Sequence, residues 1–204
     1  EGTKNNSFTM VAGFNTEKNE PAITETFYGA SEEIYASENN IYITSVDYSY
    51  NAFIEREIYK TTIYKFNLEE AKIKLQCKTE MEGNINNQFS IDEYDGNLRV
   101  ATTLGSRDKT ENRLYIYDKD LNEIGKIDNM ANGEEIYSVR FIGKVGYIVT
   151  FKEIDPLFVI DLSDPTKPEI KGELKIPGYS SYLHPSDETH IRGIGHNTKT
   201  NQYG

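Results

Sequence analysis

Short apolar runs of alternating pattern, separated by Asn, Asp, Gly and Pro, recur along almost the whole chain. Successive side chains of a β-strand point to opposite faces, so this pattern predicts short strands joined by tight turns. The best candidate for a helix, "NLEEAKIKL" (67–75), is short and runs directly into an alternating run. We therefore expect an all-β fold.

An apolar run that ends in Asn or Asp occurs four times along the chain. Its last residues are Asn15, Asn67, Asp118 and Asp161, which lie 52, 51 and 43 residues apart. An Asn or Asp side chain can accept a hydrogen bond from the backbone N–H two residues on and so open a hairpin turn. Three further strand-like runs follow each copy before the next one begins. The sequence therefore predicts one order of four strands that repeats.

Four antiparallel strands every ~40–50 residues is the period of a propeller blade. We predict β-propeller blades of four antiparallel strands, about four blade equivalents in one partial domain over residues 1–204. A β-sandwich also has short strands and regular turns, but it would not return the same strand order with the same Asx position. The predicted units are a half blade at 8–28, full blades at 33–80, 87–128 and 135–176, and a half blade at 180–195.

The segment from 139 to 195 resembles a known family, most specifically in "DPLFVIDLSDPTKPEIKGELKIPGYSSYLHP". It is similar to bacterial secreted proteins with a C-terminal β-propeller domain distantly related to WD40 repeats. It also resembles LVIVD-type repeats, in which "VIDLSDP" is followed by "P-x-I-x-G". From about 8 to 138 the likeness is weaker but continuous. The resemblance implies an extracellular or cell-surface propeller of Gram-positive bacteria, of which this chain is a fragment, and it assigns no activity to any residue.

Charge and cysteine content narrow the classes of partner. The net charge is −11, from 22 basic and 33 acidic residues. Such a chain repels phosphate backbones and anionic lipid, so we expect no nucleic-acid partner, while a divalent cation or a basic partner is compatible. The single cysteine, Cys77, excludes a disulfide framework and a multi-cysteine metal site. No apolar run approaches the ~18 residues of a membrane span, so we expect no membrane insertion in this segment.

The segment between the second and third strands of the first full unit, "DYSYNAFIEREIYK" (47–60), is the longest of its kind. Such connections lie on the propeller face where ligands and partners usually dock. Aromatic side chains beside an arginine are typical of interface hot spots. Tyr48, Phe53 and Arg56 are therefore candidate binding residues. The alternative, which we favour slightly, is a longer hairpin that buries its own aromatic side chains.

Arg140 lies in "YSVRFIG", a predicted innermost strand that would line the central channel. The favoured interpretation is a structural ion pair with a neighbouring acidic group such as Asp92. The alternative is contact with an anion or substrate in the channel.

The histidines at 184, 190 and 196 are spaced by six residues, with Pro185 and a turn between the first two. His184 and His190 are predicted cross-strand neighbours and are the candidates for a metal site. His196 would lie about 20 Å along the strand from His190, at ~3.3 Å per residue, so three imidazoles would not converge. The favoured role of His184 is a structural hydrogen bond.

Two acidic stretches predict turns rather than calcium sites. "DEYDGN" (92–97) lacks the ligand spacing of an EF-hand and indicates a hairpin turn at Gly96. In "DLSDPTKPE" (161–169), Asx-turn chemistry at Asp161 and Asp164 is favoured over a cation-binding carboxylate pair.

The sequence favours a non-catalytic, cell-surface propeller module that binds a protein or glycan partner, without a cofactor. No motif of a known hydrolase, nucleotide-binding or metalloprotease class is present. The alternative is a propeller hydrolase or lyase with an axial polar or metal-assisted site. The two half units could complete one blade together, or their open edges could pair with a second copy or with further chain, so self-association is also expected.

Overall fold

A computed structural model describes residues 8–28, 32–51, 56–69, 72–106, 109–151, 155–176, 178–187 and 190–196. These residues form sixteen β-strands and one short 3-10 turn, which confirms the predicted all-β class. Within them, no helix has the length and apolar character that crossing a membrane requires.

The strands follow one another closely in the sequence. The first six are β1 (Phe8–Gly13), β2 (Ile23–Tyr28), β3 (Ile34–Ala36), β4 (Asn40–Asn51), β5 (Arg56–Glu69) and β6 (Lys72–Glu82). The 3-10 turn η1 (Gln88–Ser90) precedes β7 (Ile91–Tyr94), β8 (Asn97–Leu104), β9 (Glu111–Tyr117) and β10 (Glu123–Met130). The last six are β11 (Glu135–Ile142), β12 (Val145–Phe151), β13 (Asp155–Asp161), β14 (Glu169–Ile176), β15 (Tyr179–Pro185) and β16 (Ile191–His196).

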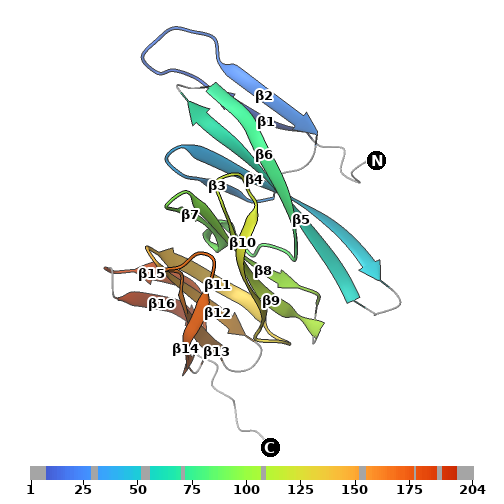
Figure 1. Ribbon diagram of the computed structural model, residues 1–204, viewed down its shortest axis with the longest axis vertical. Coiled ribbons are helices and arrows are strands. Elements are labelled where there is room, and N and C mark those ends of the chain that lie inside the picture. Colours follow the sequence, from blue (N-terminus) through green and yellow to red (C-terminus); the bar gives the residue numbers. More distant parts are fainter. Residues whose placement is uncertain are drawn as a thin grey trace, which may run out of the picture.

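The sheets have the topology of propeller blades. Three four-stranded antiparallel sheets follow the orders β3-β4-β5-β6, β7-β8-β9-β10 and β11-β12-β13-β14. The hairpins β1-β2 and β15-β16 form two-stranded sheets of their own. In each full sheet the chain moves outward strand by strand, so β3, β7 and β11 are the inner strands (Figure 1). This arrangement confirms the predicted fold class. The residue limits predicted for each blade unit remain a prediction.

The hydrophobic core lies between successive sheets rather than inside any one of them. One cluster joins the second and third full sheets, with Leu114 and Ile116 packed against residues such as Ile148 and Ile160. A second cluster joins the first and second sheets and includes Tyr42. A smaller one, around Phe66 and Ile73, holds Val11 of β1 against the first full sheet. Burial of one face of each sheet against its neighbour fixes the stacking.

The predicted Asx turns are present at three of the four repeat positions. The Oδ1 atom of Asn15 accepts from Glu17 N at 2.8 Å, and Asp118 and Asp161 accept from the residue two positions on at 2.9 Å each. Asn67 differs, because β5 continues past it to Glu69. The turn at Gly96 is also as predicted: this glycine has a φ of +76° between the paired residues Tyr94 and Asn97.

The rim turn of the third full sheet packs against the second. Asp164 accepts from the backbone N–H of Thr166 at 2.9 Å, which confirms its predicted Asx turn. The carbonyl oxygen of Pro165 approaches Gly125 of β10 so closely that a Cβ there would lie 2.1 Å from it. The "DLSDPTKPE" segment is therefore a packing element between two sheets.

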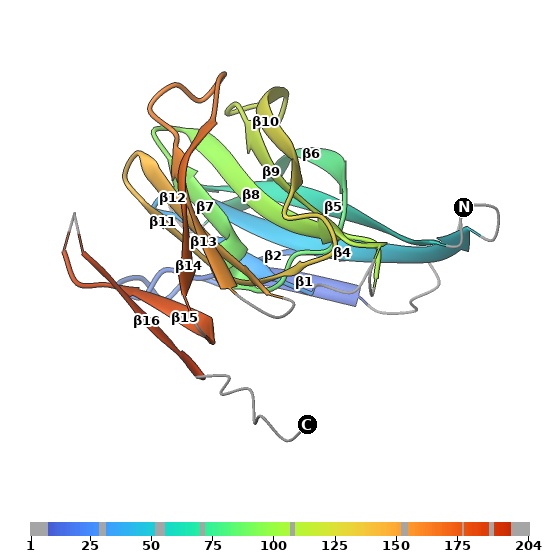
Figure 2. The ribbon, with the colours of Figure 1, turned by 90° about the horizontal axis from the view of Figure 1, so that it is seen from below.

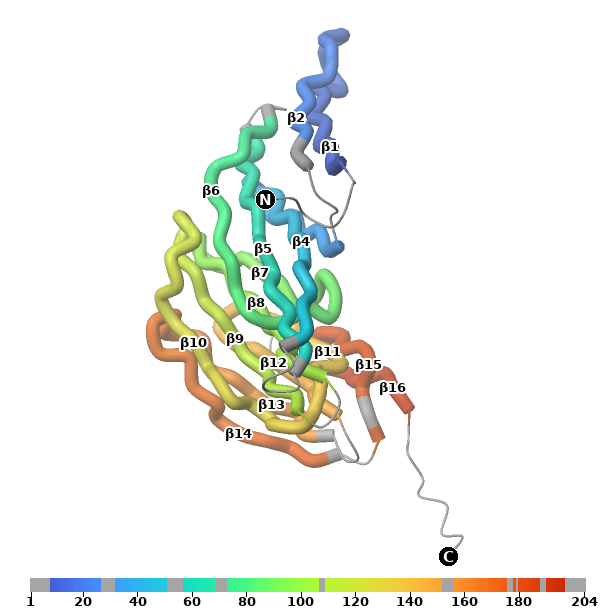
Figure 3. The backbone as a smooth tube through the Cα atoms, turned by 90° about the vertical axis from the view of Figure 1, so that its right-hand side faces the viewer, coloured from blue at the N-terminus to red at the C-terminus, as the bar shows by residue number. Residues whose placement is uncertain are grey.

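The five sheets form an open arc. The β1-β2 and β15-β16 hairpins lie at opposite ends of the molecule (Figures 1 and 3). In the described part of the chain these two hairpins do not pair, so they do not complete one blade together, as one alternative required. The side chains of Phe8 and Met10 on β1 are 72% and 65% exposed, which leaves an apolar face at this end.

The β4-β5 hairpin is longer than its counterparts. Its strands have 12 and 14 residues, whereas the equivalent β8 and β9 have 8 and 7. It extends well beyond the neighbouring sheets (Figures 1 and 2).

Candidate functional site

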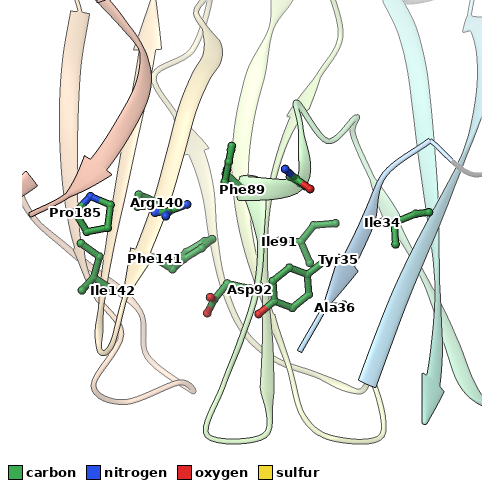
Figure 4. Close-up of a pocket in the computed structure, with 11 residues that line it drawn as sticks. Ile34, Tyr35, Ala36, Phe89, Ile91, Asp92, Arg140, Phe141, Ile142 and Pro185 are labelled. Atoms are coloured by element: carbon green, nitrogen blue, oxygen red, sulfur yellow. The ribbon is translucent and has the colours of Figure 1, made fainter. Parts of the chain in front are cut away.

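A cavity of about 610 Å³ lies where the inner strands converge. It is lined by residues of β3, η1, β7 and β11, together with Pro185 at the end of β15. Most of its wall is apolar, including Ile34, Ile91 and Ile142, and its charged lining residues are Asp92 and Arg140 (Figure 4). Its volume is within the range of small-molecule sites.

Asp92 of β7 is held by an arginine other than the predicted one. Arg99 of β8, which is 3% exposed, donates to Asp92 Oδ2 from Nε at 3.0 Å and also from Nη2. Its Nη1 donates to the carbonyl oxygen of Gly143 at 2.5 Å. The expected ion pair between Asp92 and Arg140 is therefore wrong. Asp92 instead belongs to a buried contact that ties the second sheet to the β11-β12 turn of the third.

The side chain of Arg140 on β11 has no hydrogen bond or ion pair with any described residue. Its guanidinium lies over the ring of Phe89, with 4.9 Å between the Cζ atom and the ring centroid. Phe89 in turn packs edge-on against Tyr182 of β15, with ring centroids 5.5 Å apart. Figure 4 shows Arg140 reaching from β11 toward Phe89 across the cavity. The half-buried cation is thus oriented by an aromatic ring and not neutralised by a described acid.

Glu93, next to Asp92, has a structural role, because its carboxylate is hydrogen-bonded to the first sheet. Its carboxylate accepts from Ser37 Oγ at 2.6 Å, from Asn40 Nδ2 at 3.1 Å and from Tyr42 Oη at 2.9 Å. Its backbone N–H donates to Tyr35 Oη at 3.0 Å. Burial, and next the Glu93 carboxylate, raise the pKa of Tyr42, so this phenol stays a donor. Glu93 therefore adds a hydrogen-bonded contact to the apolar cluster that the first and second sheets share, and sequence reasoning did not single it out.

The second candidate surface is one face of the long β4-β5 hairpin. Tyr48 pairs with Tyr59 and Tyr50 pairs with Glu57, so these four side chains share a face. Glu57 accepts from Tyr48 Oη at 3.3 Å and from Tyr59 Oη at 3.1 Å, and the two tyrosine rings lie 5.4 Å apart. We call these four residues the tyrosine face.

The tyrosine face is solvent-accessible. The side chains of Tyr48 and Tyr50 are 50% and 58% exposed, so the extended hairpin that sequence analysis favoured is present but does not bury these two aromatics. Phe53 lies outside the described residues, and Arg56 is described only as the first residue of β5. At the base of the face, a smaller cavity of about 170 Å³ is lined by Tyr59, Asn84 and Glu135 among others.

The histidines lie apart from both candidate sites. His184 is opposite Arg192 in the β15-β16 pair, so the prediction that His184 and His190 are cross-strand neighbours is wrong. His184 is exposed, and its Nδ1 lies 3.3 Å from Tyr182 Oη. His190 precedes β16 and contacts Asp187 at 2.9 Å, with both side chains exposed. Among the described residues, no group of three or more His, Cys, Asp or Glu side chains is arranged to hold a metal ion. Cys77 packs against the core, and burial raises the pKa of its thiol.

Comparison with known proteins agrees with this fold. The chain matches the family described as "Beta propeller domain" over residues 1–204, and it belongs to that family. It is 43% identical over 179 residues to an uncharacterized protein, MJ1554, of Methanocaldococcus jannaschii, covering 85% of this chain and 28% of that protein. It is 51% identical over 140 residues to an uncharacterized protein of Archaeoglobus fulgidus, covering 69% of this chain and 22% of that protein.

These relatives do not support the bacterial part of the sequence-based resemblance. Both come from archaea, not from Gram-positive bacteria, and the likeness to WD40 and LVIVD repeats stays a prediction. The chain spans about a quarter of the length of these curated relatives.

Proposed function

We propose that this chain is a non-catalytic binding module, exposed outside the cell or at its surface, that recognises a protein or glycan partner. The observation that carries this proposal is the tyrosine face on a hairpin that extends beyond its neighbours (Figure 2). The extracellular location rests on the sequence resemblance alone.

Three features of the tyrosine face suit recognition. Tyrosine combines a large apolar ring with a polar tip, and fixing its two side-chain torsions costs little conformational entropy. Glu57 holds Tyr48 and Tyr59 by their hydroxyls, so part of the ordering that binding requires is already present. The cavity beside Tyr59 adds the polar side chains of Asn84 and Glu135 to the aromatic surface. Aromatic and polar groups side by side fit either a protein epitope or a sugar ring with its hydroxyls.

The hydrolase or lyase alternative has less support. A general acid or base at the axis must be free to exchange a proton with substrate. The acid that lines the axial cavity, Asp92, is instead held by Arg99. The axial cavity therefore favours binding over proton transfer.

The proposal is tested by screening the wild-type chain on a glycan array and by cross-linking it to intact cells. Each ligand found is then titrated against Tyr48→Ala/Tyr50→Ala. We expect the double variant to bind about tenfold or more weakly, because two hot-spot aromatics are truncated. Phe14→Ala, which removes another exposed ring that is 66% accessible, is the matched control and should bind like wild type.

Equal loss in Tyr48→Ala/Tyr50→Ala and Phe14→Ala, or no loss in either, would remove the tyrosine face from the proposed function. A Glu57→Gln variant sharpens the result, because it keeps an acceptor for one tyrosine hydroxyl but loses the charge that holds both. We expect its affinity to lie between those of wild type and the double variant.

A further inference from the structure

We propose that the axial cavity is a binding site for a small monocarboxylate with an apolar body, and that Arg140 is the residue that binds the carboxylate. This site is separate from the tyrosine face, so either proposal can fail without the other.

The first step of the argument is charge. Arginine is charged at every physiological pH, and a half-buried cation without an anionic partner is unfavourable. Among the described residues that line the cavity, the one carboxylate is Asp92, and its charge is balanced by the buried Arg99. Arg140 has no ion pair among the described residues, so one positive charge at the axis is left for a ligand. This occurs in a chain whose net charge is −11.

The second step is geometry. The N–H groups of a guanidinium lie in its plane and point outward from its edge, in a fork that matches the two oxygens of a carboxylate. The Arg140 Cζ atom lies over the Phe89 ring, 4.9 Å from its centroid, and no described residue accepts a hydrogen bond from the guanidinium. Because Tyr182 packs against Phe89, the ring that orients Arg140 is itself fixed. The guanidinium is therefore placed beside a fixed ring (Figure 4), and its N–H donors are not used by described residues.

The third step is the class of anion. A single uncompensated cation balances one negative charge, and no other described lining residue carries a positive charge to balance a second. A phosphate dianion is therefore disfavoured relative to a monocarboxylate. Much of the remaining wall is apolar and suits an apolar body, including Ile34, Ile91, Ile142 and Pro185. The volume of about 610 Å³ admits one ring with substituents.

The test uses three probes that share one ring. Phenylacetate carries the single charge, phenylacetamide removes it, and phenyl phosphate doubles it. Titration calorimetry or ligand-observed NMR on the 204-residue chain gives the three affinities. We expect phenylacetate to bind about tenfold or more tightly than either other probe, as a charge-assisted hydrogen-bonded pair implies. Binding that is absent at 10 mM phenylacetate, roughly the weakest affinity of interest, or equal for the amide, would overturn the proposal.

Variants then test whether Arg140 is the residue that causes the preference for the charged probe. Arg140→Gln should abolish the preference for phenylacetate over phenylacetamide, and Arg140→Lys, which keeps the charge but not the fork, should retain part of it. The control is Arg192→Gln, an exposed arginine on β16 outside the cavity, which should leave all three affinities unchanged. Preference retained in Arg140→Gln would contradict the assignment. Circular dichroism checks the fold of each variant, and the probe comparison on wild type stands even if Arg140→Gln does not fold.

Discussion

The inner strands β7 and β11 occupy the same place in adjacent sheets but carry their charges differently. Asp92 and Arg140 are each the third residue back from the turn, counting from the closing pairs Tyr94–Asn97 and Ile142–Val145. Both line the axial cavity. On β7, however, Asp92 and its neighbour Glu93 are both fully engaged with residues of adjacent strands and sheets, whereas on β11 the charge of Arg140 is not.

The difference teaches which charges of a repeated fold serve the fold and which are available for function. The position in the blade does not decide whether a charge is structural or functional, because Asp92 and Arg140 occupy equivalent positions. The partners of each side chain decide its role. A charged group that is hydrogen-bonded within the protein stabilises the contact between sheets, whereas a charged group without such partners can bind a ligand. We therefore expect variants of Glu93, Asp92 and its partner Arg99 to change stability, and variants of Arg140 to change binding.

Glu93→Ala should have the largest effect on stability. It leaves the amide of Asn40 and the hydroxyl of Tyr42 without their acceptor, in two residues that are 7% and 0% exposed. Buried donors left unpaired cost 1–3 kcal/mol each, so we expect a loss of about 3 kcal/mol in the free energy of unfolding. Urea unfolding followed by circular dichroism measures it.

Glu93→Gln is the matched control, because it keeps one acceptor oxygen and the shape of the side chain. Its loss should be smaller than that of Glu93→Ala. If alanine cost less than about 1 kcal/mol, the joint between the first and second sheets would depend on the apolar cluster alone.

Arg99→Met should have the second largest effect. It removes the cation that holds Asp92 and the donor to the carbonyl oxygen of Gly143. Because the side chain of Asp92 is 26% exposed and partly hydrated, we expect about 2 kcal/mol, below the range for a fully buried pair. A double variant, Arg99→Met/Asp92→Asn, should recover part of the loss, since no charge is left unpaired. The single variant Asp92→Asn completes the cycle, and a loss in the double variant equal to the sum of the two single losses would show that the two side chains are not coupled.

The part of the fold that depends on local chemistry could be predicted from the sequence. Alternation specified strands, and the Asx turns at Asn15, Asp118 and Asp161 formed because the hydrogen bond spans only two residues. At Asn67 the same residue type did not end the strand, because β5 continues in its pairing with β6 through Glu69. Pairing with a neighbouring strand there outweighs the local turn preference.

The site was less accessible to sequence reasoning because its contacts are not local. Arg140 was a candidate from its place on an inner strand, but its expected partner was wrong. The interaction of Arg99 with Gly143 spans 44 residues and that of Glu93 with Tyr42 spans 51. Alternation shows which face a residue occupies and not which of several acids and bases on that face will pair. One signal was present: the sequence places Asp92 and Arg99 symmetrically about the turn at Gly96, which predicts cross-strand neighbours.

Arg140→Gln should have the smallest effect on stability, and it tests the comparison most directly. Its interaction with described residues is the contact with the Phe89 ring, and a partly exposed cation–π pair contributes about 0.5 kcal/mol. We therefore expect the free energy of unfolding, measured by urea denaturation, to fall by no more than about 0.5 kcal/mol. A loss comparable to that of Arg99→Met would mean that Arg140 stabilises the inner strands as Arg99 does. In that case, the distinction between β7 and β11 would fail even if phenylacetate bound. A small loss together with the predicted loss of carboxylate preference would establish that the two inner strands differ in role.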